Sequence, residues 1–132
     1  MLVLFLGAIL GLACCGCSQG PQPVHVSGVA TQDGVPLKSG KVVLTSLDGH
    51  PPAVGQIQAD GAFVLSTFRP YDGAIPGRYR VAVTTDLQQG NRKLRATFHP
   101  GRDFVVTVEE EGENHVPIEV SRASGWRVTT EK

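Results

Sequence analysis

Histidines are the side chains of this sequence best suited to bind a metal ion or to move a proton. The alternation of apolar and polar residues places two of them in predicted strands and two in loops. A zinc site needs three or four ligands that converge in space. His25 and His115 come close if the first and last strands pair, but both are expected to face solvent. We therefore expect no metal site and no cofactor; the four histidines are His25, His50, His99 and His115.

No catalytic motif accompanies these histidines in the sequence. It contains no Gly-x-Ser-x-Gly elbow and no paired metalloprotease histidines. Residues 34–41 superficially suggest a phosphate loop, but one residue too many separates the glycines, and Val42 replaces the hydroxyl that would ligate magnesium. We therefore expect a protein that is not an enzyme. One enzymatic alternative is a hydrolase with a site among His99, Arg95 and Asp103, which only their proximity in the sequence supports.

The three cysteines, Cys14, Cys15 and Cys17, lie together at the end of an apolar segment. Metal sites and disulfide frameworks join distant segments, which such a cluster does not do. The segment instead resembles the bacterial lipoprotein signal, in which a small residue precedes a cysteine that is lipidated and becomes the mature N-terminus. Cys14, which follows Ala13, fits that pattern better than Cys17; the alternative is an ordinary signal peptide with incidental cysteines. No cysteine follows residue 17, which excludes a thiol nucleophile and an internal disulfide.

Residues 1–13 are continuously apolar but too few to span a membrane as a helix, which takes about 20 residues. They match the apolar segment of a secretory signal. No Lys or Arg precedes them, so either the α-amino group supplies the only positive charge or the true start lies upstream of Met1. We interpret residues 1–17 as a lipoprotein signal segment and residues 18–23, which are polar with Gly and Pro, as a tether. This organisation predicts an extracytoplasmic protein, in the periplasm or at the cell surface, anchored to a membrane by lipid.

Charge argues against nucleic acid as a partner. Twelve basic and twelve acidic residues give a formal net charge of +0, so no overall field attracts a polyanion. The densest basic group, Arg92, Lys93 and Arg95, is expected in a solvated loop, and the acidic run at residues 109–113 offsets it. The expected partners are the membrane, through the lipid anchor, and another envelope protein or a glycan.

Sixteen glycines and nine prolines interrupt the chain too often for long helices, and the apolar runs between them are rich in Val and Thr. Side chains in these runs alternate between two faces, which is the period of a strand. In residues 77–84, for example, Tyr79, Val81 and Val83 fall on one face and Arg78 and Arg80 on the other. The pattern predicts about seven strands, at residues 24–31, 41–47, 53–59, 62–67, 77–84, 104–109 and 115–121.

Four Asp-Gly pairs separate the predicted strands; they begin at Asp33, Asp48, Asp60 and Asp72. Each aspartate is expected to form a turn rather than to bind calcium, because a calcium loop spaces several carboxylates within one segment. Asp60-Gly61 gives the clearest hairpin signal. Gly28 is expected to break the first strand, and Pro117 to place the last strand at a sheet edge. Residues 86–101 are expected to form a long irregular connection.

The predicted fold is an all-β, antiparallel Greek-key β-sandwich at residues 24–121, followed by a C-terminal tail at residues 122–132. Phe63 and Tyr79 are expected to face one another across its core, and Phe104 is expected to be buried.

Several motifs of the predicted sandwich resemble carboxypeptidase regulatory-like domains, which have a transthyretin-like fold. The motifs are VSGV at residues 26–29, DGVPL at 33–37, DGAFVL at 60–65 and IPGRYRV at 75–81. The resemblance covers residues 24–120 and implies the same fold. It implies no catalytic residue, because such domains are thought to serve as structural or interaction modules.

Aromatic residues in turn-rich segments are the candidate ligand contacts. Phe68 and Tyr71 flank Arg69 and Pro70, and Trp126 lies beyond the last predicted strand. An exposed Tyr71 or Trp126 would stack on a sugar or a partner protein, whereas a Trp126 that folds back would cap the sandwich. These residues leave two non-enzymatic interpretations, of which we favour the first: a structural or protein-interaction module, and a carbohydrate-binding module.

Overall fold

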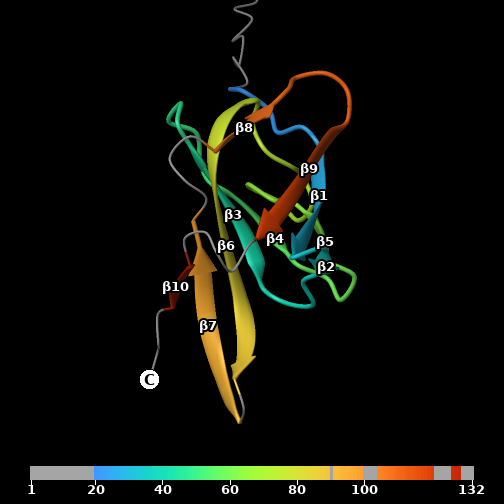
Figure 1. Cartoon of the computed structure of the whole chain (residues 1–132). Helices are drawn as coiled ribbons and strands as arrows, with labels where there is room; N and C mark the ends of the chain where they lie inside the picture. The colour runs from blue at the N-terminus through green and yellow to red at the C-terminus, as the bar shows by residue number, and fades with distance from the viewer. Residues whose placement is uncertain (1–19, 90, 100–103, 121–125, 129–132) are drawn as a thin grey trace, which may run out of the picture.

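The computed structural model describes residues 20–89, 91–99, 104–120 and 126–128, and within these ranges it contains strands and no helix (Figure 1). The all-β class is confirmed. Each of the seven predicted strands has a counterpart, and β2, β7 and β10 are additional. The ten strands are β1 (Val26–Gln32), β2 (Val35–Pro36), β3 (Lys41–Ser46), β4 (Ala53–Gln56), β5 (Ala62–Val64), β6 (Gly77–Gln89), β7 (Arg92–Phe98), β8 (Val105–Val108), β9 (Asn114–Val120) and β10 (Trp126–Val128).

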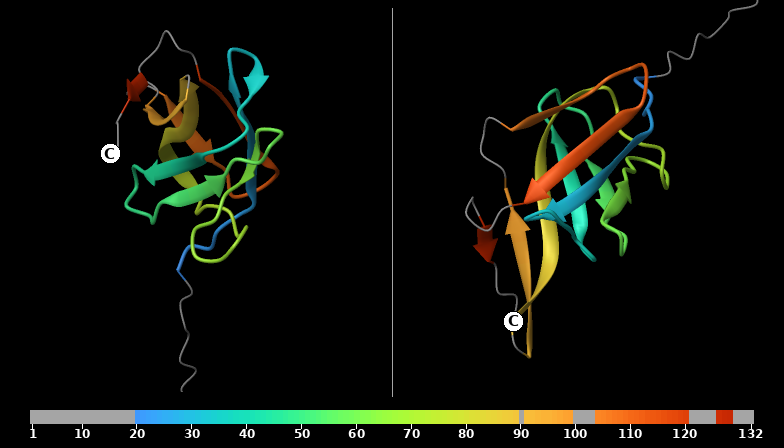
Figure 2. Two further views of the ribbon diagram at one scale, coloured as in Figure 1. Left: turned by 90° about the horizontal axis from the view of Figure 1, so that it is seen from below. Right: turned by 45° about the vertical axis from the view of Figure 1, so that its right-hand side comes forward.

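The strands form two sheets that face one another across the molecule (Figure 2). In the first sheet β1 is central, with β5 and β2 along one side and β9 along the other. The second sheet has the order β10-β7-β6-β3-β4, and β8 pairs with the beginning of β6. Antiparallel pairs therefore dominate both sheets.

One strand pair departs from the predicted antiparallel arrangement. β9 runs parallel to β1, with Val26 opposite Asn114 and Gln32 opposite Val120. The sequence did not reveal this because alternation reports which side chains face inward and carries no information on strand direction. The edge position indicated by Pro117 is confirmed, since among the described strands β9 pairs with β1 alone.

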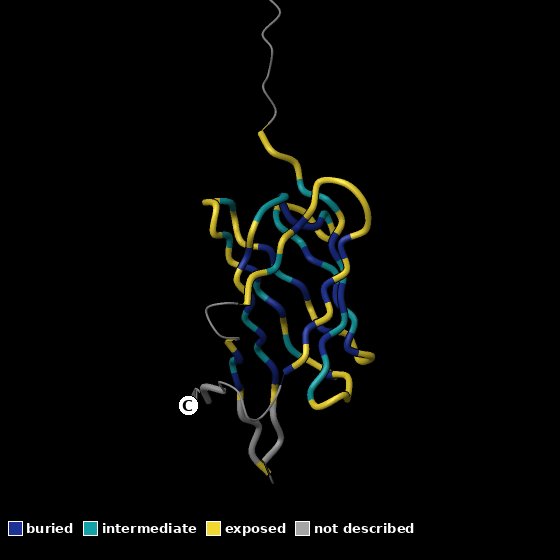
Figure 3. The backbone as a smooth tube through the Cα atoms, turned by 45° about the horizontal axis from the view of Figure 1, so that its top comes forward, coloured by how far each residue is buried: buried dark blue, intermediate teal, exposed yellow. Residues whose placement is uncertain are grey.

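Alternate side chains of both sheets meet in one hydrophobic core. Figure 3 shows buried positions along strands of both sheets. In β9, Val116, Ile118 and Val120 are buried and the residues between them are exposed, as predicted. Phe63 on β5 and Tyr79 on β6 are 1% and 0% exposed. The two largest fully buried side chains therefore come from opposite sheets, which confirms the expectation that both lie in the core.

Gly28 does not break the first strand, contrary to the prediction. It lies within β1, and a Cβ atom built on it would overlap the ring of Phe63 and the backbone oxygen of Val116. The missing side chain thus makes room for the Phe63 ring beneath the sheet, a close approach that is a common reason for glycine within a strand.

The irregular connection predicted at residues 86–101 is wrong for most of its length. The second half of β6 pairs with β7, from Val83 opposite Phe98 to Gln89 opposite Arg92. Figure 1 shows this hairpin extending past the rest of the molecule, at the end away from the N-terminal segment. Polar residues hid the strand alternation here, although the Gly-Asn pair at residues 90–91 is a hairpin signal that the prediction passed over.

The Asp-Gly turns are confirmed, although the two strands joined by Asp60-Gly61 meet only in an isolated bridge between Val54 and Ser66 instead of forming a regular hairpin. Asp33 and Gly34 have φ values of 48° and 81°, the left-handed pair of a tight hairpin between β1 and β2. At the predicted hairpin, Asp60 accepts a hydrogen bond from the Ala62 backbone N–H at 3.0 Å. The strands on its two sides, β4 and β5, belong to opposite sheets, so the turn carries the chain across the sandwich.

Two aromatic residues lie elsewhere than predicted. Phe104 is 42% exposed and precedes β8, so it is not a core residue. Trp126 does not lie beyond the last strand, because it begins β10, where it is opposite Phe98 of β7. Three residues are too short a run for alternation to detect.

Candidate binding site at the 66–73 loop

The loop at residues 66–73, between β5 and β6, displays the two most exposed large hydrophobic side chains of the described residues. Phe68 is 63% exposed and Tyr71 is 67% exposed. Arg69 and Pro70 lie between them and are exposed as well. Tyr71 is therefore exposed in a turn-rich segment, which is the condition that the sequence analysis set for a ligand contact.

The carboxylate of Asp72 fixes the path of this loop. Its Oδ1 accepts a hydrogen bond from the Thr67 backbone N–H at 2.7 Å, and its Oδ2 accepts from the N–H groups of Phe68 and Arg69 at 3.0 and 2.9 Å. Desolvation opposes ionisation, but these three donors outweigh it and hold the pKa of the Asp72 carboxyl below its ordinary value of 3.8. An ionised side chain thus organises the backbone on which both aromatic residues stand.

Hydroxyl and backbone groups close the rest of the loop. The Tyr71 backbone N–H donates to Ser66 Oγ at 2.8 Å, and the Thr67 hydroxyl donates to the Gly73 carbonyl at 2.7 Å. Backbone N–H groups of Asp72 and Gly73 donate to the carbonyls of Arg69 and Leu65, at 3.3 and 2.9 Å. So many internal bonds in a short exposed segment indicate a loop with one preferred conformation.

The backbone of Tyr71 is strained. Its φ is 62°, the left-handed region that bulky residues rarely adopt. Such a residue costs of the order of 1–3 kcal/mol and persists only where surrounding contacts enforce it. The hydrogen bonds of Asp72 and Ser66 supply that enforcement.

The predicted tether joins the sandwich beside this loop, at Val24. Val24 and Ala74 exchange two backbone hydrogen bonds of 2.9 and 3.0 Å. Gly73 permits this contact, because it has a φ of 96° and a Cβ atom on it would overlap the Val24 carbonyl. Between the tether and the loop lies an open cavity of about 560 Å³. It is lined by Gly20, Pro21, Gln22, Pro23, Phe68, Arg69 and Asp72.

Arg69 gives this cavity a positive group. Among the residues that the structure describes, no carboxylate oxygen lies within 4.0 Å of its guanidinium. The nearby Asp72 carboxylate is engaged by backbone donors. The Arg69 side chain is therefore available to an anionic group from outside the chain.

The chain was compared with protein-family models, with curated proteins and with solved structures. None of the three comparisons finds a match.

The other predicted site residues lie apart from the loop or outside the described residues. Cys14 and Cys17 belong to the latter group, so their lipidation stays a prediction. Over the described ranges, no helix is long and apolar enough to cross a membrane. Trp126 is placed by its backbone in β10, on the sheet that does not contain β5, and its expected stacking or capping role stays a prediction as well.

Within the part of the chain that the structure describes, the histidines belong to no cluster of metal ligands. His115 lies opposite Ser27 in the β1–β9 pair, which brings it toward His25 as anticipated, and both side chains are exposed. His99 is exposed and His50 half-buried. No group of three His, Cys, Asp or Glu side chains in the described part of the chain is arranged to hold a metal ion.

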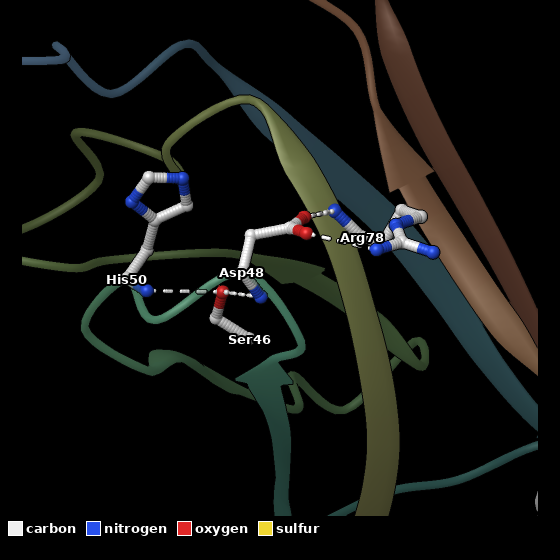
Figure 4. A network of polar contacts seen from close by, with 4 residues as sticks. All are labelled: Ser46, Asp48, His50 and Arg78. Carbon is white, nitrogen blue, oxygen red and sulfur yellow. Dashed lines mark hydrogen bonds and ion pairs between the residues drawn. The ribbon is translucent and has the colours of Figure 1, made fainter.

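A second polar network joins the turn after β3 to the start of β6 (Figure 4). Asp48 Oδ2 accepts from the Arg78 backbone N–H at 2.8 Å, and Oδ1 accepts from the Arg78 guanidinium at 3.0 Å. The backbone N–H of Arg78, followed by its side chain, holds the pKa of the Asp48 carboxyl below 3.8. Ser46 Oγ accepts from the backbone N–H groups of Asp48 and His50 at 3.0 and 3.1 Å.

This network has the residue types of a catalytic triad without its geometry. The Asp48 carboxylate is directed at Arg78 and not at the His50 ring, and Ser46 meets His50 through the backbone (Figure 4). In a triad the carboxylate would orient the histidine and the histidine would accept from the serine hydroxyl. The network instead fastens a turn to β6, a role invisible in the sequence because Asp48 and Arg78 are 30 residues apart.

The alternative hydrolase site is only partly described. Arg95 Nε lies 3.7 Å from Asp86 Oδ1 across the β6–β7 hairpin, and His99 follows the end of β7. Asp103 lies outside the described residues. The contact of Arg95 with Asp86 involves neither His99 nor Asp103, so it does not support a hydrolase site.

Proposed function

We propose that this chain is a lipid-anchored, extracytoplasmic protein whose β-sandwich binds a partner through the 66–73 loop and catalyses no reaction. The observation that carries the proposal is the exposure of Phe68 and Tyr71 on a loop held in one conformation by the Asp72 carboxylate. Aromatic residues and Arg are enriched in binding surfaces. A preformed loop also lowers the entropic cost of binding.

The strain at Tyr71 supports a binding role for the loop. A glycine or asparagine at position 71 would adopt a φ of 62° at lower cost than tyrosine. The exposed ring of Tyr71 buries little apolar surface in the fold, and a residue with less strain could make the same backbone hydrogen bond to Ser66. A ring that contacts a partner accounts for both the exposure and the strain.

A lipid anchor is supported by the three clustered cysteines and by the place where the tether ends. The tether reaches the sandwich at Val24, beside the loop. An extended chain to Val24 spans at most about 36 Å from Cys14 and about 25 Å from Cys17. The proposed anchor would therefore hold the loop near the membrane that carries it, where it would meet other envelope components.

A Greek-key, transthyretin-like topology related to the carboxypeptidase regulatory-like domains is part of the same proposal. Its support is the role that the shared motifs play in packing. Gly28 admits the Phe63 ring, Asp33 and Gly34 form a hairpin turn, and the Tyr79 hydroxyl donates to the Ile75 carbonyl at 2.6 Å. These are structural roles, as expected for an interaction module.

Two measurements on native cells test the proposal. Mass spectrometry of the mature N-terminus is expected to find a lipidated Cys14, with Cys17 as the alternative, in the membrane fraction. Crosslinking of intact cells with a diazirine reagent, which captures proteins and glycans, is expected to recover a partner with the native chain. That partner should be lost with Phe68→Ala/Tyr71→Ala and kept with Phe104→Ala, which removes an exposed aromatic residue elsewhere.

Recovery of an unmodified chain from the soluble cytosol would refute the anchor. Equal capture by the native chain and by the Phe68→Ala/Tyr71→Ala variant would refute the loop as the contact site.

A further inference from the structure

We infer that the cavity between the tether and the 66–73 loop binds a carbohydrate that carries carboxylate groups. This inference rests on the proposed function in one respect, namely that the loop is the contact site. It adds the chemical class of the ligand, which follows from the three kinds of group that surround the cavity.

Aromatic faces provide the first kind of group. Phe68 lines the cavity and is 63% exposed, and Tyr71, 67% exposed, stands three residues further along the same fixed loop. The C–H faces of a sugar ring pack on aromatic rings, while the hydroxyls at the ring edge stay in contact with water. Exposed rings on a fixed backbone suit such a ligand, because an amphipathic sugar does not require full burial.

The positive charge of Arg69 provides the second kind. A guanidinium presents paired N–H donors that match the two oxygens of a carboxylate. No carboxylate of the described residues lies within 4.0 Å of this guanidinium. The Asp72 carboxylate also lines the cavity, but its oxygens accept three backbone hydrogen bonds. These neutral donors occupy the oxygens of Asp72 without cancelling its charge. The Arg69 guanidinium is therefore the charged group of the cavity that can still bind a ligand, which favours an acidic sugar over a neutral one.

Hydrogen-bonding groups on the tether provide the third kind. Gln22 lines the cavity and donates its Nε2 to the Gly20 carbonyl at 3.1 Å. That bond orients the side-chain amide, whose Oε1 can then accept from a sugar hydroxyl. The volume of about 560 Å³ lies in the range of cavities that hold small ligands. A cavity of this size can hold a short oligosaccharide, whereas a flat protein surface would not enter it.

The test uses the full chain purified in detergent and two oligosaccharides of equal length, one of galacturonic acid and one of galactose. Calorimetric or NMR titration is expected to show binding of the acidic oligosaccharide and at least about tenfold weaker binding of the neutral one, the ratio that one charge-assisted hydrogen-bond pair provides. Raising the salt concentration should narrow this difference.

Two variants and a matched control assign the binding to the site. Arg69→Gln should weaken binding of the acidic oligosaccharide about tenfold or more and abolish the preference for it, since the amide keeps a polar group but no charge. Phe68→Ala, which removes the aromatic ring that lines the cavity, should weaken binding of both oligosaccharides. Arg80→Gln removes an exposed arginine on β6, away from the cavity, and should change neither affinity.

The inference is overturned if the acidic oligosaccharide does not bind, if both oligosaccharides bind equally, or if Arg69→Gln binds as the native chain does. Equal thermal unfolding of the native chain and Arg69→Gln would show that a loss of binding does not reflect a loss of fold. A crosslinked partner protein that requires Tyr71, together with no oligosaccharide binding, would refute this inference and leave the proposed function standing.

Discussion

The 66–73 loop and the turn at residues 47–52 use the same kinds of hydrogen bond but have different structural roles. Each contains an Asp-Gly pair whose carboxylate accepts at least one backbone N–H. The oxygen of a serine accepts further N–H groups: Ser66 within the loop, and Ser46 just before the turn. Asp48 reaches 30 residues along the chain and fastens its turn to β6, whereas Asp72 closes its own loop. The second arrangement leaves the loop projecting and its aromatic residues exposed.

The glycines of the two pairs provide the largest contrast. Gly73→Ala should lower the free energy of unfolding by about 3 kcal/mol or more, because strain at a φ of 96° adds to an overlap with the Val24 carbonyl. Gly49→Ala should cost about 1 kcal/mol, because open space surrounds it despite a φ of 82°. Urea denaturation of both variants measures the difference. Equal losses would show that the tether is not packed against the loop.

Tyr79 lies beside both regions, since its hydroxyl bonds to Ile75 just after the loop and its backbone is opposite Ser46 just before the turn. Tyr79→Phe should lower the free energy of unfolding by about 1–2 kcal/mol, because the buried Ile75 carbonyl loses its partner.

The same substitution should change the alkaline unfolding profile. Burial, followed by the negative charge of Asp48, raises the pKa of Tyr79 above 10.0. The neutral phenol therefore contributes stability that is fully present below pH 10.0 and is lost as the pH rises through the folded-state pKa. The Phe variant should lack this component of the alkaline loss, and an identical profile would contradict the buried hydrogen bond.

Asp72→Ala tests the carboxylate that organises the loop. It should cost about 1–2 kcal/mol of stability, as for other side chains that cap several backbone donors. The folded-state pKa of Asp72 is depressed, so its contribution is present above the ordinary value of 3.8 and is lost as the pH falls below it. Carboxylates titrate at about pH 2 to 6. Denaturant titrations over this range should show that the free energy of unfolding falls less with acid in the variant than in the native chain.

Asp48→Ala is the matched control for that experiment. It should shift acid stability in the same direction, because the pKa of Asp48 is also lowered. It should not alter the NMR amide signals of the 66–73 loop, whereas Asp72→Ala should shift those of Thr67, Phe68 and Arg69. Unchanged loop signals in Asp72→Ala would contradict its assigned role.

The smallest expected effect is a gain in stability. Tyr71→Asn should raise the free energy of unfolding by about 0.5 kcal/mol, because asparagine tolerates the left-handed region better than tyrosine. Partner binding should fall in the same variant. A variant that is more stable and binds the partner as well as the native chain would show that the strain at Tyr71 serves no function.

Much of this architecture followed from alternation and turn chemistry. The inward faces of β6 and β9 were predictable because strongly apolar residues recur there with period two, and Asp33-Gly34 carried its own hairpin signal. The parallel pairing of β1 with β9 was not predictable, since two inward-facing strands can pair in either direction. The hairpin of β6 and β7 was missed because its residues are mostly polar.

The sequence indicated some residues of the candidate site but not the contacts between them. Tyr71 was noticed as an aromatic residue in a turn-rich segment, and Asp72 as a turn former. Which N–H groups Asp72 accepts depends on the path of the loop in space, and the part played by Gln22 depends on the Val24–Ala74 contact. Neither contact has a signature in local residue types.

Site-specific photo-crosslinking in intact cells tests the central claim most directly. A photoreactive amino acid would replace Tyr71 in the loop, or Leu47, which is 37% exposed, in the turn that is fastened to β6. We expect a discrete crosslinked product from position 71 and none from position 47. The same product from both positions, or a product from position 47 alone, would contradict the central claim.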